Sequence, residues 1–464
     1  MEHPISSFSI ALGAASVGVA SHLTYFVRGE HHLHSTRLVG ILFAAPFILF
    51  LGILHFTGYQ AAAEITAIMT ISYLSALTAS ILSYRAFFHP LCKFPGPLTA
   101  RLSQWQHILR VWNKLDNFRQ SDRLHKKYGP IVRMGPNELS IIIPESVPVI
   151  LGPSSKCQKS PWYDAVGYPN TSLHATRDRE EHDKRRRVWD HAFSAKALRN
   201  YEGSVSKYAN EVVSQISKRS GEPLNATLWS YLFAFDVMGD LAFGKSFDAL
   251  KVGKMHYAVE LMREEPEKPD IMSWLLDGET YAQNPRRSLN GDSRLVIGAG
   301  SETTAGVMTH ILYHLAEDQR VISKLYAELE NLNFPTEAMK LKDARYLNSV
   351  ISESLRLHPA IPGGVFRQTP PEGILIDTKD GPIHIPGNVT VSEPAWTIGR
   401  CIYSCIGKQL ALMEIRAVIS RIVTHFDIEF APGEDGLNLL NKTKDVFTME
   451  MAPLMLAFTR KQKI

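Results

Sequence analysis

The amino-acid sequence predicts a mainly α-helical fold with a minor β-sheet (an α+β domain), preceded by N-terminal transmembrane helices. Three apolar stretches, each about as long as a membrane-crossing helix, lie before residue 90. From Trp105 onward the hydrophobic pattern is mostly helical. Only a few short segments there have the composition and turn residues of neighbouring strands.

Length and composition narrow the class of protein. The chain has 464 residues, which suits one large catalytic domain with an anchor, and 45% apolar residues allow a substantial core. The net charge is only +4, with no long basic block interleaved with aromatic residues, so nucleic acid is not an expected partner. Four cysteines, none in a C-x-x-C pair, are too few for a disulfide framework and fit a catalytic part in a reducing cytosol.

The N-terminal part is predicted to cross a membrane. Its apolar stretches are Ile5–Val27, Leu38–Thr57 and Ala61–Ser83. Three spans with a lumenal N-terminus place every cluster of Lys and Arg on the cytosolic side, as the positive-inside rule requires. We therefore expect residues 1–90 to form a membrane anchor of up to three transmembrane helices, and residues 91–464 to form the cytosolic catalytic domain.

Two ionisable residues in these stretches leave alternatives open. His22 and Glu64 would be costly in hydrocarbon, so one or two spans with an interfacial helix, or helices buried in a core, remain possible readings. The segment that follows, "YRAFFHPLCKFPGP", is predicted to be a stiff linker rather than a helix, because its prolines break helical geometry.

Two segments are predicted to contain strands joined by turns. In "YGPIVRMGPNELSII", Ile131–Met134 and Leu139–Ile142 flank the turn formers at residues 135–137. In "IHIPGNVTV" the turn falls at Pro386–Gly387. No internal repeat or low-complexity tract accompanies them.

The stretch from Arg294 to Leu315 is predicted to be a helix buried in a large core, because it is apolar nearly all round. It contains three glycines, at 298, 300 and 306, each of which costs about 1 kcal/mol relative to alanine. A close backbone approach to a flat cofactor, or a local widening of the helix, would explain them. Glu302, Thr303 and Thr304 place a carboxylate and hydroxyls in its middle; a packing site with locally satisfied hydroxyls is the alternative.

Two other helices carry charged residues at helical spacing. In "DARYLNSVISESLRLHP", Glu353 and Arg356 are three residues apart, where an ion pair forms easily, although most such pairs are solvated. In "EHDKRRRVWDHAFS", His182 and Arg186 are four residues apart on one face. The basic run at residues 184–187 also fits a solvated helix face.

The segment "CIGKQLALMEIR" places a cysteine just before a predicted helix. A reactive thiolate is stabilised by the N–H groups at a helix N-terminus, which Cys405 would have close by. Gly407 lets the backbone come close to a neighbouring group. A lone cysteine is usually a buried small hydrophobe, and Cys401, which lacks this context, is read in that way.

Taken in order, these segments resemble the cytochrome P-450 family of haem-thiolate monooxygenases. The most specific match is to the family's C-x-G-x-x-L-A-x-x-E segment at Cys405–Glu414, and "AGSETT" resembles the oxygen-binding part of its central helix. The resemblance covers residues from about 90 to 460. The proline-rich hinge and "YSCIGKQLALMEIR" are most similar to fungal members that act in secondary metabolism.

The resemblance implies a haem b cofactor (iron protoporphyrin IX) between the central helix and the helix after Cys405. Cys405 would be the axial thiolate ligand of the iron, and the Gly407 backbone would come close to it. Thiolate ligation favours O–O cleavage. Thr303 would hydrogen-bond dioxygen, and Glu302 would help to relay protons.

The resemblance also assigns the charged residues. His182, Arg186 and Arg367 would bind the haem propionates. Glu353 and Arg356 would form a buried structural pair.

The chain departs from the family's pattern just before Cys405. The family usually has an aromatic residue seven positions back, a glycine four back and a basic residue two back, where this chain has Ile398, Cys401 and Tyr403. A PERF-like stretch, whose arginine normally joins the Glu353–Arg356 pair, is missing. A half-satisfied buried charge network would be costly.

A second block is missing between "FGKSFDALKVGKMHYAVELM" and "PDIMSWLLDGE", where the family normally has two long helices that roof the substrate pocket. Both gaps predict a shortened roof and a shortened loop before the cysteine. They resemble excised blocks, as a genuine deletion or a faulty gene model would leave.

Three functions follow from the resemblance. The first is a monooxygenase that oxidises a small lipophilic substrate with O2, takes electrons from an NADPH-dependent haemoprotein reductase, and faces the cytosol from the endoplasmic reticulum membrane. The second is an inactive membrane-tethered remnant of the fold. The third is a haem-thiolate isomerase or dehydratase, against which Glu302 and Thr303 argue, because those residues serve oxygen activation.

Overall fold

The computed structural model describes residues 6–167, 171–254, 271, 285–399 and 405–461. The chain divides into two compact units. The first comprises residues 1–108 and 131–139, and the second comprises residues 109–130 and 140–464. The predicted mainly helical fold with small sheets is confirmed.

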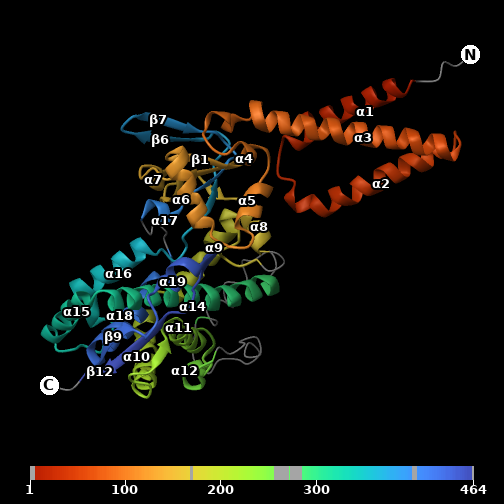
Figure 1. Cartoon of the computed structure of the whole chain (residues 1–464). Helices are drawn as coiled ribbons and strands as arrows, with labels where there is room; N and C mark the ends of the chain where they lie inside the picture. Colours follow the sequence, from red (N-terminus) through yellow and green to blue (C-terminus); the bar gives the residue numbers. More distant parts are fainter. Residues whose placement is uncertain (1–5, 168–170, 255–270, 272–284, 400–404, 462–464) are drawn as a thin grey trace, which may run out of the picture. The chain divides into compact units, whose positions relative to one another are not determined.

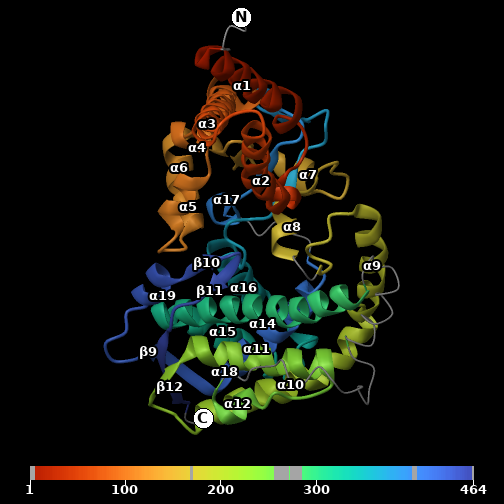
Figure 2. The same cartoon turned by 90° about the vertical axis from the view of Figure 1, so that its right-hand side faces the viewer.

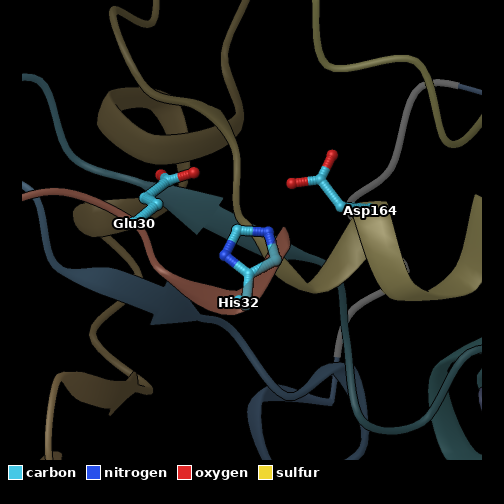
Figure 3. Close-up of side chains that lie close together, drawn as sticks. All are labelled: Glu30, His32 and Asp164. Atoms are coloured by element: carbon cyan, nitrogen blue, oxygen red, sulfur yellow. The ribbon is translucent and has the colours of Figure 1, made fainter. Parts of the chain in front are cut away.

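The first unit contains the three predicted apolar helices (Figure 1). All three are long and apolar enough to cross a membrane, and they comprise residues Ser7–Phe26, His32–Leu54 and Tyr59–Phe88. They consist of α1 (Ser7–Ser21) with the π turn η1 (His22–Phe26), η2 (His32–His34) with α2 (Ser35–Leu54), and α3 (Tyr59–Ser83) with the π turn η3 (Tyr84–Phe88). Glu30, labelled in Figure 3, lies in the connection between the first two, and His32, also labelled there, is the first residue of η2.

The α1 and α3 helices pack closely because of a small residue at their contact. A Cβ atom on Gly18 would lie only 2.5 Å from the carbonyl oxygen of Tyr73. Close backbone approach at small residues is the usual way in which apolar helices associate in lipid. Nearby, Nδ1 of the buried His22 lies 2.8 Å from the Ser80 hydroxyl, so this ionisable residue has a polar partner.

The linker after these helices is more helical than the sequence predicts. The π turn η3 continues α3 as far as Phe88, and helical structure stops only at His89, whose ψ of 140° is extended. Pro90 disfavours a helical residue directly before it but not the residues further upstream, which explains the difference. The unit continues with η4 (Pro90–Lys93), α4 (Leu98–Leu102), the start of α5 (Trp105–Val111), β1 (Ile131–Gly135) and the first half of β2 (Glu138–Ile141).

The second unit is built around four long helices that pack as a bundle (Figure 2). In the cyclic order α10–α11–α14–α18, neighbouring helices are in contact, and their apolar side chains form the main core. Their bounds are α10 (Ala195–Ser217), α11 (Ala226–Phe243), α14 (Pro285–Glu317) and α18 (Lys408–His425).

Shorter helices surround this bundle. Among the described residues they are α6 (Asn117–Tyr128), α7 (Ser146–Leu151), α8 (Trp162–Gly167), α9 (Arg179–Ala192), α12 (Ala249–Val252), α15 (Gln319–Asn331), η7 (Lys340–Asp343), α16 (Arg345–Leu357), α17 (Ala395–Ile398) and α19 (Leu437–Lys442). α15 and α16 pack on α14, α18 and each other.

The strands of the second unit form small antiparallel groups. They are β3 (Gln158–Lys159) with β5 (Phe366–Gln368) and β8 (Thr390–Ser392); β6 (Ile374–Thr378) with β7 (Gly381–Ile385); β4 (Pro223–Asn225) with β12 (Met455–Arg460) and β9 (Phe426–Phe430); and β10 (Lys444–Val446) with β11 (Thr448–Glu450).

The strands predicted around Gly135–Asn137 are confirmed as β1 and β2. Those around Pro386–Gly387 are confirmed as β7 and β8, but each pairs with another strand.

The central helix α14 is longer than predicted and is α-helical throughout, so the expected local widening is not observed. Its glycines have a different explanation. A Cβ atom on Gly300 would lie 2.6 Å from Sδ of Met238 in α11, so this glycine lets the two helices approach closely. By contrast, a Cβ atom on Gly298 would meet nothing within 4 Å. The helix is also not buried all round, because Ala299 and Glu302 are exposed.

This difference between two glycines of one helix is testable. Gly300→Ala should lower the free energy of unfolding of the haem-free chain by about 1–3 kcal/mol, because the added methyl group collides with Met238. Gly298→Ala is the matched control and should be neutral or stabilising by up to about 1 kcal/mol through helix propensity. Denaturant unfolding in detergent would compare them, and equal effects of the two substitutions would contradict the close α11–α14 contact.

Candidate functional site

One buried ion pair fixes α9 against the central helix. Nη2 of Arg185 donates to Oδ2 of Asp292 at 2.7 Å, and both side chains are 1% exposed. The other carboxylate oxygen of Asp292 accepts from the backbone N–H of Leu173 at 2.6 Å. Asp292 therefore holds both α9 and the segment before it. The N-terminus of α9 is capped by Asp178, whose carboxylate accepts from the backbone N–H of Glu181.

His182 and Arg186 both lie on α9, where their spacing of four residues places them on one face of the helix. Both are partly buried, with side-chain exposures of 26% and 32%. Nδ1 of His182 lies 3.0 Å from the carboxylate of Asp183, and Nε of Arg186 donates to Asp190 at 3.0 Å. Both partners are more than half exposed, so neither ion pair is buried away from solvent.

Arg367 joins this region through strand pairing. It lies on β5 directly opposite Lys159 on β3. Both cations contact Tyr163, a buried residue of α8: Nη1 of Arg367 lies 3.5 Å from its hydroxyl, and Nζ of Lys159 lies 5.8 Å from its ring centroid. The His174 ring packs edge-on against the same ring, with centroids 5.1 Å apart.

The carboxylate of the next residue in α8, Asp164, already has a cationic partner. Asp164, labelled in Figure 3, accepts from Nη1 of Arg177 at 2.5 Å, and both side chains are about four-fifths buried.

Positive charge dominates this cluster, which comprises Lys159, His174, His182, Arg186 and Arg367. Burial, reinforced by the nearby arginines, lowers the pKa of Lys159 to about 7. Burial and then Lys159 lower the pKa of His174 to about 4, and the same two causes lower the pKa of His182. An anion bound among these groups would stabilise their protonated, positively charged forms.

Cys405 lies at the start of α18, as predicted. It is exposed and free, and α18 begins three residues later at Lys408 with Gly407 as its N-cap. A Cβ atom on Gly407 would lie 3.8 Å from the Cys405 sulfur and 4.0 Å from the ring of Phe193, so the glycine lies against both groups. A thiolate at this position is close to the positive end of the helix dipole.

Glu302 and Thr303 lie on the face of α14 that is partly open. Glu302 is exposed and accepts a 2.6 Å hydrogen bond from the hydroxyl of Thr448 in β11. The hydroxyl of Thr303 donates to the carbonyl of Ala299 at 2.7 Å. That carbonyl, one turn back, satisfies the hydroxyl locally.

The prediction of a buried Glu353–Arg356 pair is wrong in one respect. The ion pair forms, with N–O distances of 2.6 and 2.8 Å, but the side chains are 55% and 51% exposed. Among the described residues no third charged partner joins the pair, in keeping with the missing PERF-like stretch. Solvation avoids the cost that an incomplete buried network would have.

The structure brings together part of the predicted site. His182, Arg186 and Arg367 gather around Lys159, whereas within the described residues no hydrogen bond or ion pair links them to Cys405, Glu302 or Thr303. The predicted shortening before Cys405 includes residues 400–404, which lie outside the described residues. The predicted loss of the substrate roof falls largely on residues 255–270 and 272–284, which also lie outside them.

Sequence reasoning missed Lys159 and His174. Neither occurs in a periodic pattern or a recognised motif. Lys159 is placed by the pairing of β3 with β5, and His174 by packing on Tyr163. The signal available from the sequence was weak, because Lys159 lies on a strand of only two residues and His174 lies in an irregular connection.

Fold and site define a class: a helical protein with three apolar N-terminal helices, a cationic cluster for an anionic ligand, and a free thiol at a helix N-terminus. Comparison with known proteins gives the family. A model of the family described as "Cytochrome P450" matches residues 95–276 and 266–401. The chain belongs to the cytochrome P450 family.

Curated relatives match nearly the whole chain. It is 34% identical to the tryprostatin B 6-hydroxylase of Aspergillus fumigatus, over 97% of this chain and 96% of that protein. It is 34% identical to the cytochrome P450 monooxygenase notG' of Aspergillus versicolor, over 99% and 100% respectively. It is 33% identical to the cytochrome P450 monooxygenase FCK2 of Fusarium pseudograminearum, over 96% of each. The chain is therefore an oxidoreductase of the kind found in fungal secondary metabolism, as predicted.

The alignments also agree with the missing blocks. The alignment with the tryprostatin B 6-hydroxylase runs over 545 positions, more than the 464 residues of this chain, so that relative has segments that this chain lacks. The two family matches meet at residues 266–276, close to the predicted loss of the substrate roof. The second match ends at residue 401, before Cys405.

The family implies a haem-thiolate cofactor, and the described residues fit one. The two propionates of a haem are anions, and most of the charges that act on Lys159 and His174 are positive. Within it, Nε2 of His174 is buried without a hydrogen-bond partner among the described residues. The exposed thiol of Cys405 before α18 has the chemistry of a sulfur ligand.

The lowered pKa of His174 predicts acid sensitivity of the haem-free chain. The folded state holds this histidine neutral down to about pH 4, whereas the unfolded state binds a proton below about 6.5, so stability is lost as pH falls through that range. His174→Gln should remove up to about 2 kcal/mol of this loss between pH 7 and 4.5. Denaturant unfolding at the two pH values measures it. His425→Gln, an exposed control at the end of α18, should leave the loss unchanged, and an unchanged loss in His174→Gln would contradict the account.

Proposed function

We propose that this chain is a membrane-anchored haem-thiolate monooxygenase of secondary metabolism. It oxidises, by hydroxylation, a small lipophilic organic substrate with O2 and with electrons from an NADPH-dependent haemoprotein reductase. The observation that carries the proposal is the combination of a cationic cluster and a free thiol before α18 in a chain of this family. The relatives support it, because they are named as a hydroxylase and as monooxygenases.

The cofactor in this proposal is haem b. Cys405 provides the axial thiolate, and Gly407 leaves room for the sulfur beside the backbone. His182, Arg186 and Arg367 hold the propionates through charge-assisted hydrogen bonds. When bound, the haem supplies the electron-rich iron centre that activates dioxygen.

Two residues of α14 manage protons in this proposal. The Glu302 carboxylate is exposed, so it can exchange protons with solvent, and its bond from Thr448 fixes one of its oxygens. The Thr303 hydroxyl, next in the chain, donates to the Ala299 carbonyl at rest and can turn its proton toward a substrate oxygen. A carboxylate beside a hydroxyl on the open face of a helix suits the delivery of protons from water.

The membrane arrangement is part of the proposal. Residues 1–90 form the anchor, with the N-terminus lumenal, and residues 91–464 form the haem-binding catalytic domain on the cytosolic side of the endoplasmic reticulum. Three apolar helices support the anchoring. This orientation is supported by Arg28 between the first two helices, by Arg37 in the first turn of α2, and by Lys93 and Arg101 after the third.

A remnant of the fold without a haem is the second candidate. The exposed Glu353–Arg356 pair favours it, because the pair lacks the partner that normally fixes the loop before the cysteine. Against it, the cationic cluster and Cys405 remain.

The carbon monoxide difference spectrum of the reduced full-length chain, expressed in membranes and supplied with haem, separates the two candidates. The proposal predicts a thiolate-type Soret band that Cys405→Ala abolishes and Cys401→Ala leaves in place. A spectrum without haem uptake would favour the remnant. A thiolate-type band that survives Cys405→Ala would contradict the assignment of the ligand.

A further inference from the structure

The hydrogen bonds of Lys159 distinguish it from the other cations of the cluster. Its Nζ donates to the carbonyl oxygens of Leu173 and Thr176, both at 2.9 Å. A neutral amine has two N–H donors, and these two carbonyls use both of them. A protonated ammonium has a third N–H, which no described residue accepts.

The surroundings of Lys159 oppose that third proton unless an anion is present. Arg367 faces it across the β3–β5 pair, and Arg185 and Arg186 of α9 add positive charge. Within the described residues, the acidic group that offsets these charges is Asp183, whose carboxylate is half exposed and shared with His182. Burial therefore leaves Lys159 with a pKa of about 7, close to the pH of the cytosol.

This chain lacks one of the basic residues that neutralise the haem propionates in its family. The family usually places a basic residue two positions before the cysteine, where this chain has Tyr403. A tyrosine hydroxyl does not neutralise a propionate. Lys159, on a separate strand next to Arg367, can supply the missing positive charge.

We propose that Lys159 is a further ligand of the haem propionates and that it takes up a proton when haem binds. The inference rests on the proposed function, because it requires haem in this site. The two carbonyls of Leu173 and Thr176 hold Nζ in place, and the third N–H of the ammonium donates to a propionate oxygen. Lys159, which is far from Cys405 in the sequence, thereby supplies the positive charge that the family's basic residue before the cysteine supplies.

The rate of haem loss from the full-length protein in detergent tests the proposal. Transfer of haem to excess apomyoglobin is followed for the native chain, Lys159→Gln, Lys159→Arg and Lys156→Gln. Lys156 is the matched control, because it is three residues away and exposed, and its ion-pair partner within the described part of the chain is the exposed Glu372 at 3.8 Å. Lys159→Gln should lose haem about tenfold faster, as expected for one charged hydrogen bond. Lys159→Arg and Lys156→Gln should stay close to the native rate.

Two further measurements distinguish a ligand from a merely structural residue. With iron protoporphyrin IX dimethyl ester, which has no propionate charge, the native chain and Lys159→Gln should lose the cofactor equally fast. In the native chain, the affinity for ordinary haem should fall as pH rises above 7, because Lys159 of the haem-free site is then neutral and must take up a proton for haem to bind. In Lys159→Gln this dependence on pH should disappear.

The outcomes separate the two proposals. If the native chain binds haem and Lys159→Gln loses it at the native rate, Lys159 is not a ligand while the proposed function stands. If Lys159→Gln loses haem and its dimethyl ester faster to the same extent, the lysine has only a structural role. If the native chain takes up no haem, both the proposed function and this inference are overturned.

Discussion

The geometry of the site depends on the buried ion pair between Arg185 and Asp292. Two side chains with 1% exposure have lost nearly all contact with water, and breaking such a pair typically costs several kcal/mol. Asp292 comes from the central helix, Arg185 from α9, and the second oxygen of Asp292 holds Leu173. One carboxylate thus fixes the helix with His182 and Arg186 and the segment with His174.

This arrangement explains why the surrounding cations lack internal compensation. The buried carboxylate of Asp292 is engaged by Arg185 and by the Leu173 N–H. Of the other acids on α9, Glu181 is engaged by the same Arg185, and Asp183 and Asp190 are more than half exposed and contribute little. The cluster therefore keeps the low pKa values of Lys159 and His174 until an anion balances the charge.

Local patterns made much of the fold predictable. The three apolar stretches, the central helix and the helix after Cys405 each have a signal contained within about 20 residues, and the structure has all of them. The position of Cys405 before a helix N-terminus also followed from its neighbours in the sequence. Such elements depend on hydrophobic period and capping, which a single sequence carries.

Features that depend on contacts between distant segments were not predictable. Gly300 looked like a surface for a flat cofactor, but it is Met238, from a different helix, that approaches it. The burial of Glu353 and Arg356 was inferred from relatives whose covering segment this chain lacks. Lys159 is brought next to Arg367 by pairing with a strand more than two hundred residues away. Only the folded chain shows these partners.

The coordination of iron tests the central claim most directly. The account holds that the cationic cluster and the thiol before α18 bind one haem, with Cys405 as its sulfur ligand. Iron X-ray absorption of the purified, haem-loaded chain should show a sulfur atom in the first coordination shell, and Cys405→Ala should lose it. A first shell of nitrogen and oxygen atoms alone in the native chain would contradict the account.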